Sequence, residues 1–121
     1  MPITVFLSGG GRSLANLISA NDRGELHLDF RCVISSSGKV RGFEIAREAG
    51  IHTRIITKKS HPAPAAYCEA MFQPCRENGT ALVVMAGFLK HVLIPDDFQG
   101  RVLNIHPSLL PSFGGEGMYG H

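Results

Sequence analysis

The sequence predicts an α/β fold: a Rossmann-like, open and mostly parallel sheet with helices on both faces. Two observations lead to this prediction. Short apolar runs alternate with longer amphipathic segments along the whole chain. No repeat, linker or low-complexity segment interrupts the alternation, which indicates one domain over residues 1–121. Strands separated by helical segments form parallel sheets through right-handed crossovers, so helices come to cover both faces.

The first half of the chain contains two strand–helix pairs. Residues 3–7 (ITVFL) are a compact apolar run, which predicts a buried strand. Residues 13–20 carry leucine and isoleucine at helical spacing. Residues 28–34 predict the second strand, and residues 40–49 predict a helix that ends at Gly50.

The second half repeats the alternation. Residues 53–56 predict a short strand, and residues 63–77 are helical by composition. Pro74 is expected to end or kink that helix. Residues 81–85 (ALVVM) give the clearest buried strand, and residues 101–105 (RVLNI) predict the last one.

The composition excludes several classes of protein. Hydrophobic residues make up 44% and charged residues 18%, which excludes a disordered tail and a coiled coil. A formal net charge of +2 argues against a dedicated nucleic-acid binder. No apolar run approaches the roughly 18 residues of a membrane span, and no signal peptide is recognisable. Three cysteines without CxxC spacing indicate a reduced, cytoplasmic compartment.

Three segments follow predicted strand ends and carry chemistry. They are residues 8–13 (SGGGRS), residues 86–92 (AGFLKHV) and residues 104–111 (NIHPSLLP). Ligands of open parallel sheets bind beyond the carboxyl ends of the strands. We therefore expect these three segments to converge in space.

The glycine-rich segment, residues 8–13, predicts a phosphate site. Glycines let backbone N–H groups approach an anion, and a following helix N-terminus favours negative charge. The GKS/T ending of a nucleotide P-loop and the third glycine of a dinucleotide fingerprint are both absent. A small phosphorylated metabolite is therefore the sharper interpretation. The alternative is a tight turn with Ser13 as the helix N-cap.

Asn104 and His106 are the candidate catalytic residues. Residues i and i+2 of a strand point the same way, so the two side chains would face one side. Histidine can act as acid or base near neutral pH, and an asparagine N–H can stabilise an oxyanion. The alternative is a satisfied histidine beside a loop. The other histidines show no zinc-binding spacing, so no metal site is predicted.

The chain resembles the N-terminal part of a family of folate-dependent enzymes. SGGGRSLANLISA, CVISSSGKVRGFEIAREAGI, MAGFLKHVL and GRVLNIHPSLLPSF occur in the order and spacing of the phosphoribosylglycinamide formyltransferases. The resemblance covers essentially all 121 residues. NIHPSLLP is specific to the wider formyltransferase superfamily, and the glycine loop favours the glycinamide ribonucleotide branch.

The resemblance implies a role for each matching residue. Asn104 and His106 match the catalytic pair of the family. Two further sets match binding positions: Gly11, Arg12 and Ser13 for the phosphoribosyl substrate, and Leu89, Lys90, His91, Val92 and Asn104 for the folate. Two positions depart from the family pattern, because Arg12-Ser13 replaces Ser-Asn and Pro64 replaces a folate-contacting arginine.

The implied reaction is formyl transfer from 10-formyltetrahydrofolate to the amine of 5-phosphoribosylglycinamide in purine synthesis. It needs no metal, and the implied partners are these two small molecules, with no nucleic acid and no membrane. Members of the family are much longer, and the remaining half supplies a catalytic aspartate near the histidine. We therefore expect the 121-residue chain to be truncated at its C-terminus and nearly inactive alone.

Two other functions remain open from the sequence. One is a non-catalytic module that binds a phosphometabolite through residues 8–13 and does not need His106. The other is a sister formyltransferase whose acceptor is methionyl-tRNA or a nucleotide sugar. The glycine loop and the weak net charge argue against the sister enzymes.

Overall fold

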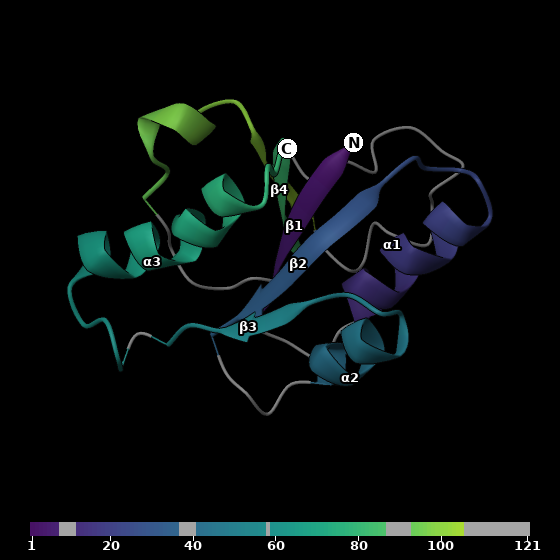
Figure 1. The fold of residues 1–121 in the computed structure, drawn as a ribbon, viewed down its shortest axis with the longest axis horizontal. Helices are drawn as coiled ribbons and strands as arrows, with labels where there is room; N and C mark the ends of the chain where they lie inside the picture. The colour runs from purple at the N-terminus through teal and green to yellow at the C-terminus, as the bar shows by residue number, and fades with distance from the viewer. Residues whose placement is uncertain (8–11, 37–40, 58, 87–92, 106–121) are drawn as a thin grey trace.

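The apolar runs of the sequence form five strands of one sheet, and the amphipathic segments form helices between them (Figure 1). In the computed structural model, the described residues are 1–7, 12–36, 41–57, 59–86 and 93–105. The elements in chain order are β1 (Pro2–Leu7), α1 (Arg12–Asp22), β2 (Asp29–Ser35), α2 (Arg41–Glu48), β3 (Thr53–Ile55), α3 (Pro64–Glu77), β4 (Leu82–Ala86), the 3₁₀ helix η1 (Asp96–Phe98) and β5 (Val102–Ile105). Every predicted element is present, with bounds that agree within a residue or two.

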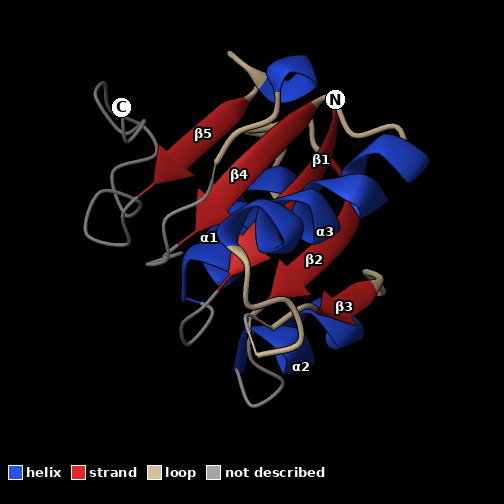
Figure 2. Ribbon diagram, turned by 90° about the vertical axis from the view of Figure 1, so that its left-hand side faces the viewer, coloured by secondary structure: helices blue, strands red, loops and turns tan. Residues whose placement is uncertain are grey.

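The sheet has the strand order β3-β2-β1-β4-β5, and all four strand pairs are parallel (Figure 2). The chain moves outward from β1 to β3 and then crosses back to β4. This reversal places α1 and α2 on one face of the sheet and α3 on the other (Figure 1). The predicted Rossmann-like architecture is confirmed.

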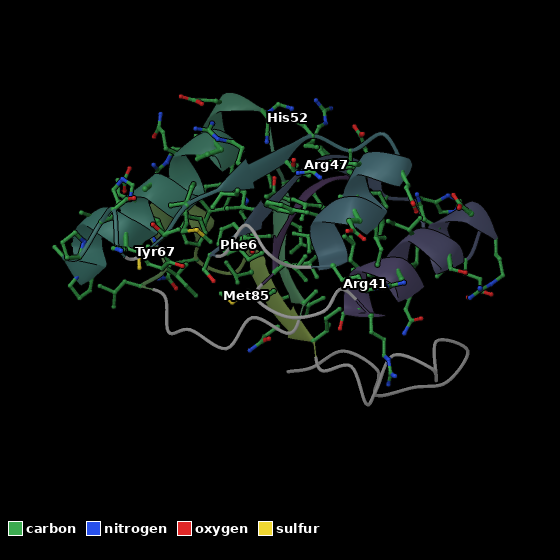
Figure 3. All side chains as sticks on the ribbon, turned by 90° about the horizontal axis from the view of Figure 1, so that it is seen from below. Phe6, Arg41, Arg47, His52, Tyr67 and Met85 are labelled. Carbon is green, nitrogen blue, oxygen red and sulfur yellow. The ribbon has the colours of Figure 1, made fainter. Side chains whose placement is uncertain are left out.

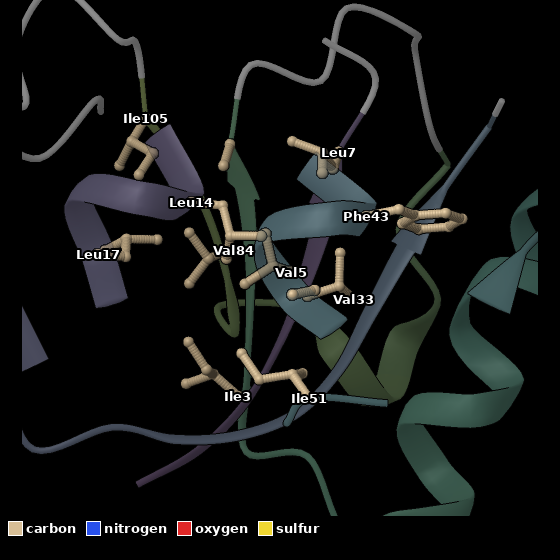
Figure 4. Packing of buried hydrophobic residues seen from close by; sticks show 12 residues of the cluster. Ile3, Val5, Leu7, Leu14, Leu17, Val33, Phe43, Ile51, Val84 and Ile105 are labelled. Atoms are coloured by element: carbon tan, nitrogen blue, oxygen red, sulfur yellow. The ribbon is translucent and has the colours of Figure 1, made fainter. Parts of the chain in front are cut away.

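Each face of the sheet has its own hydrophobic core. The first core lies under α1 and α2 and includes Val5, Leu14 and Phe43 (Figure 4). The second lies under α3 and includes Phe6 and Phe72, whose rings meet edge to face at 5.2 Å between centroids. Neighbouring residues of β1 therefore enter opposite cores, as the period of two in a strand requires.

The expectation that Pro74 could end α3 is wrong. Pro74 does not end the helix, which continues to Glu77. The ring is buried on the packed side of the helix, and the proline lies three residues before the helix ends. A proline there removes one backbone hydrogen bond, and burial of its ring offsets part of that loss.

Candidate functional site

The carboxyl ends of β1, β4 and β5 lie side by side at one edge of the sheet. Leu7 of β1 pairs with Ala86 of β4, and Ala86 pairs with Ile105 of β5. The three segments that the sequence singled out therefore leave the sheet from neighbouring positions. Six predicted site residues lie outside the described residues, and their roles stay predictions: Gly11, Leu89, Lys90, His91, Val92 and His106.

The N-terminus of α1 contains an unusual buried hydroxyl. Ser13 is the second residue of the helix and is only 3% exposed, and its Oγ has no hydrogen-bond partner within the described part of the chain. The alternative of Ser13 as an N-cap is therefore wrong, because the helix already includes Arg12 and the hydroxyl caps nothing. A buried hydroxyl without a partner costs about 1–3 kcal/mol, which a ligand can recover.

The charge at the same helix end is also unfavourable to the isolated helix. Arg12 is exposed at the first position of α1, and the first turn carries no acidic residue. A cation at a helix N-terminus opposes the helix dipole by about 0.3–1 kcal/mol. An anion at this place would bind the free N–H groups of the first turn and reverse the sign of that interaction.

Asn104 lies at the same carboxyl edge of the sheet as the start of α1, but on the other face. It is exposed on β5 and pairs in register with Met85 of β4. Ile105 belongs to the core under α1 and α2, so the alternation of the strand turns Asn104 toward the α3 face. Figure 3, a view from below, labels Met85, the register partner of Asn104, and Phe6 of the second core. The exposed amide can both donate and accept a hydrogen bond there.

Leu93, the first described residue after β4, contacts α3. The backbone N–H of Leu93 donates to the Sγ of Cys68 on α3, at 3.0 Å. Ala86 and Leu93 thus hold the two ends of the predicted folate segment, residues 87–92, at defined places. Pro64, which departs from the family pattern, is the exposed first residue of the same helix.

The cysteines are structural in character. Cys32, Cys68 and Cys75 are free and buried. Burial raises the pKa of Cys32 to about 11 and that of Cys75 to about 12, so both stay thiols near neutral pH. The described residues contain no group of three or more metal-binding side chains. No helix in the described ranges is both long and apolar enough to cross a membrane.

Arg41 is a candidate that sequence reasoning missed. It is the first residue of α2 and is exposed, and α2 packs against α1. The available signal was a basic residue at the start of a helix that follows a strand, the same arrangement as Arg12. Nothing in the sequence alone predicted that α1 and α2 contact each other.

The fold and the site together define a class of protein. The chain belongs to the formyl transferase family, which matches residues 1–120. Among curated proteins, it is similar to the phosphoribosylglycinamide formyltransferase of Escherichia coli, at 35% identity over 118 residues, covering 95% of this chain and 55% of that protein. The chloroplastic phosphoribosylglycinamide formyltransferase of Vigna unguiculata is 36% identical over 123 residues, with 98% and 38% covered.

Solved structures give the same result. The glycinamide ribonucleotide transformylase 1 of Symbiobacterium toebii superposes with a TM-score of 0.83 at 30% identity. That match covers 88% of this chain and 51% of the other. The chain therefore spans roughly two fifths to little more than half of the relatives it matches.

Proposed function

We propose that this protein transfers a formyl group from 10-formyltetrahydrofolate to the amine of 5-phosphoribosylglycinamide, a step of purine biosynthesis. The observation that carries the proposal is the register of the strand ends. It brings the start of α1, with its unpaired Ser13 hydroxyl, to the same edge as Asn104. The names of the similar proteins support formyl transfer to phosphoribosylglycinamide.

The acceptor's phosphate binds at the start of α1. Backbone N–H groups at Gly11 and in the first turn, the Ser13 hydroxyl and the Arg12 guanidinium are all donors, which is the donor set that a phosphate needs. The described half of this set fits an anion, because Ser13 lacks a partner and Arg12 is exposed.

The folate lies between the ends of β4 and β5 and the segment that returns to α3. Leu89, Lys90, His91 and Val92 form its predicted wall, and Asn104 offers an amide to its polar groups. The exposed position of Asn104 supports this assignment, because no described group competes for the amide. The reaction uses only proton transfer and charge stabilisation, so we propose no metal.

The chemistry follows from two side chains. The acceptor amine attacks the formyl carbon, and a new C–N bond forms as the carbonyl oxygen becomes negative. The Asn104 amide and a protonated His106 stabilise this oxygen. The protonated His106 then gives its proton to the folate nitrogen as the bond from that nitrogen to the formyl carbon breaks, and the neutral imidazole takes up the proton of the attacking amine. A positioned acid or base contributes about 10²–10⁴-fold, and an oxyanion donor about 10²–10³-fold.

The first test identifies the acceptor without requiring turnover. Thermal unfolding of the 121-residue chain is measured with 5-phosphoribosylglycinamide, methionyl-tRNA and a nucleotide sugar in turn. We expect stabilisation by 5-phosphoribosylglycinamide alone, because a ligand stabilises the state that binds it. Stabilisation by either of the other acceptors instead would assign the protein to a sister formyltransferase.

The second test measures formyl transfer and its dependence on Asn104 and His106. Replacing either residue with alanine should lower turnover at least 100-fold and leave acceptor binding intact. Glu48→Gln, an exposed change at the far end of α2, is the control.

The chain alone should transfer formyl groups much more slowly than a full-length relative, because the family's aspartate belongs to the half that this chain does not span. Acceptor binding that never leads to transfer, in the chain or joined to a relative's second half, would favour the binding module.

We also propose that the partners are small molecules and that the reaction takes place in the cytoplasm. The buried free cysteines support a reducing compartment. Fractionation of cells that carry a tagged copy tests the location, and recovery in an organelle, as the name of the Vigna unguiculata relative suggests for that protein, would contradict it.

A further inference from the structure

Two neighbouring helices of this protein begin with an exposed arginine. α1 starts at Arg12 and α2 starts at Arg41, and the two helices pack against each other on one face of the sheet. Each helix follows a strand of the same parallel sheet, so both starts lie at the carboxyl edge. Packed helices are about 8–10 Å apart, a distance that two extended arginine side chains can bridge.

Neither arginine contributes to the fold that is described. Among the described residues, neither guanidinium forms an ion pair or a hydrogen bond. Each cation opposes the dipole of its own helix, and the two positive charges repel each other. Glu44 gives the first turn of α2 one favourable charge, and no bond links it to Arg41.

Arg47 of the same helix makes an instructive contrast. It lies in the last turn of α2, where a cation favours the helix dipole, and its guanidinium lies 5.9 Å from the centre of the Phe43 ring. Figure 3 labels Arg41 and Arg47 near the two ends of the helix. One arginine of α2 is thus placed as folding alone prefers, and the other is placed against that preference.

An independent observation indicates that the two arginines bind an anion. The Ser13 hydroxyl, at the start of α1, is buried and has no partner among the described residues. A single anion between the two helix starts would accept from this hydroxyl and from the first-turn N–H groups. It would also pair with both guanidinium groups, which are suited to bidentate binding of phosphate oxygens.

We propose that Arg41 is a second phosphate-binding arginine, which acts with Arg12 to select a phosphomonoester dianion as the acceptor's anionic group. The proposal rests on and deepens the function proposed above, because it adds a residue of α2 to Arg12 and Ser13 at the start of α1. It also supplies positive charge where Arg12-Ser13 departs from the family pattern.

The test compares Arg41→Gln with Arg47→Gln, using inorganic phosphate as the probe. The thermal midpoint of each variant is measured without phosphate and over a phosphate titration at constant ionic strength. Arg41→Gln should keep or raise the midpoint without phosphate and weaken phosphate binding about tenfold. Arg47→Gln should lower the midpoint without phosphate and leave phosphate binding unchanged, because it loses a favourable dipole and ring contact.

The outcomes separate this inference from the proposed function. Equal phosphate binding in Arg41→Gln and the unchanged protein would overturn the inference, as would equal losses in the two variants or no binding by the unchanged chain. Formyl transfer with an unaltered KM for 5-phosphoribosylglycinamide in Arg41→Gln would overturn it and leave the function intact. Loss of phosphate binding specific to Arg41→Gln, in a protein that transfers no formyl group even when it is joined to a relative's second half, would support the phosphate site and reject the function.

Discussion

At the scale of single residues, a buried hydroxyl that has a hydrogen-bond partner can be compared with one that has none among the described residues. The first indicates a structural role and the second a binding role. The Thr4 Oγ1 lies 2.6 Å from the Thr80 Oγ1, a hydrogen bond between the starts of β1 and β4 that spans 76 positions of the chain. The Ser13 hydroxyl is equally buried and has no partner within the described ranges. The threonine pair is satisfied in the folded protein, whereas Ser13 is satisfied only when something else binds.

Replacing Ser13 with alanine should therefore leave the free protein as stable as before or stabilise it by up to about 1 kcal/mol, because an unpaired buried hydroxyl is removed. Thr80→Val is the matched control and should cost about 1–3 kcal/mol, because it removes the hydrogen bonds of the buried Thr80 hydroxyl with Thr4 and Asn78. Urea unfolding measures both changes. A loss of stability in Ser13→Ala as large as that in Thr80→Val would show that Ser13 has a structural role.

Arg101 is a structural arginine at the amino edge of the sheet. Its Nε donates to the Ala81 carbonyl at 2.9 Å, and its two terminal nitrogens donate to the carbonyls of Thr80 and Asp97, each at 2.7 Å. The guanidinium also lies 4.5 Å from the centre of the Phe98 ring.

Arg101→Lys should lower the free energy of unfolding by about 2–3 kcal/mol, because a lysine cannot reproduce this planar set of donors. Arg76→Lys is the comparison, since Arg76 forms its ion pairs with the exposed carboxylates Glu69 and Asp97. Exposed ion pairs contribute about 0–1 kcal/mol, so its loss should be the smaller one in the same urea experiment. Equal losses would contradict this account of Arg101.

At the scale of elements, the periodicity of apolar residues predicted the strands and helices, because burial of those residues determines where these elements form. The strands and helices were predictable because alternating apolar residues enter the core on each face, as the run in β1 shows. The continuation of α3 through Pro74 was not predictable from local preference, since packing of the buried ring decides it. Contacts such as Arg101 with Thr80 were not predictable either, because they join residues that only the sheet order brings together.

Some features of the candidate site could also be predicted from the sequence, and others depend on tertiary packing. The segments at the carboxyl edge were predictable because every parallel strand ends there, and the register confirms that β1, β4 and β5 end side by side. The burial of Ser13 and the contact of α2, which begins at Arg41, with α1 depend on how the helices pack, and this packing could not be predicted from a single sequence. Asn104 and His106 were singled out by the i, i+2 pattern of the strand and by the resemblance, and their catalytic roles are predictions.

The start of α3 offers a test of local structure by itself. Ala63 occupies the N-cap position with extended backbone angles, φ −76° and ψ 131°, and makes no capping hydrogen bond. Ala63→Ser should raise the free energy of unfolding by about 0.5–1 kcal/mol, because a serine hydroxyl there can accept from a free N–H of the first turn. Ala65→Ser, an exposed change inside the helix, should instead cost a few tenths of a kcal/mol. Thermal unfolding in parallel decides between these signs.

At the scale of the whole molecule, the second core couples folding to alkaline pH. Cys32 of β2 and Cys75 of α3 both belong to this core, and they are 1% and 0% exposed. Burial raises their pKa values from an ordinary 9.0 to about 11 and about 12. Burial also raises the pKa of the Tyr67 phenol in the same core.

These raised values predict how stability changes with pH. Below pH 9 both thiols are protonated in the folded and the unfolded chain, so their contribution is constant. Between about pH 9 and 11 the unfolded chain releases protons that the folded chain retains, so unfolding becomes easier as pH rises. Each thiol should then lower the free energy of unfolding by about 1.4 kcal/mol per pH unit, until the pH reaches its folded pKa.

Urea unfolding at pH 8 and pH 10.5 measures the difference in the free energy of unfolding between the two pH values. Cys75→Ala is less stable at both values because it leaves a cavity, yet the difference between the two should shrink. Val33→Ala makes a cavity in the first core, on the other face of the sheet, without removing a thiol, so it should keep the full difference. If Cys75→Ala and Val33→Ala show the same dependence on pH, the thiols are not its source.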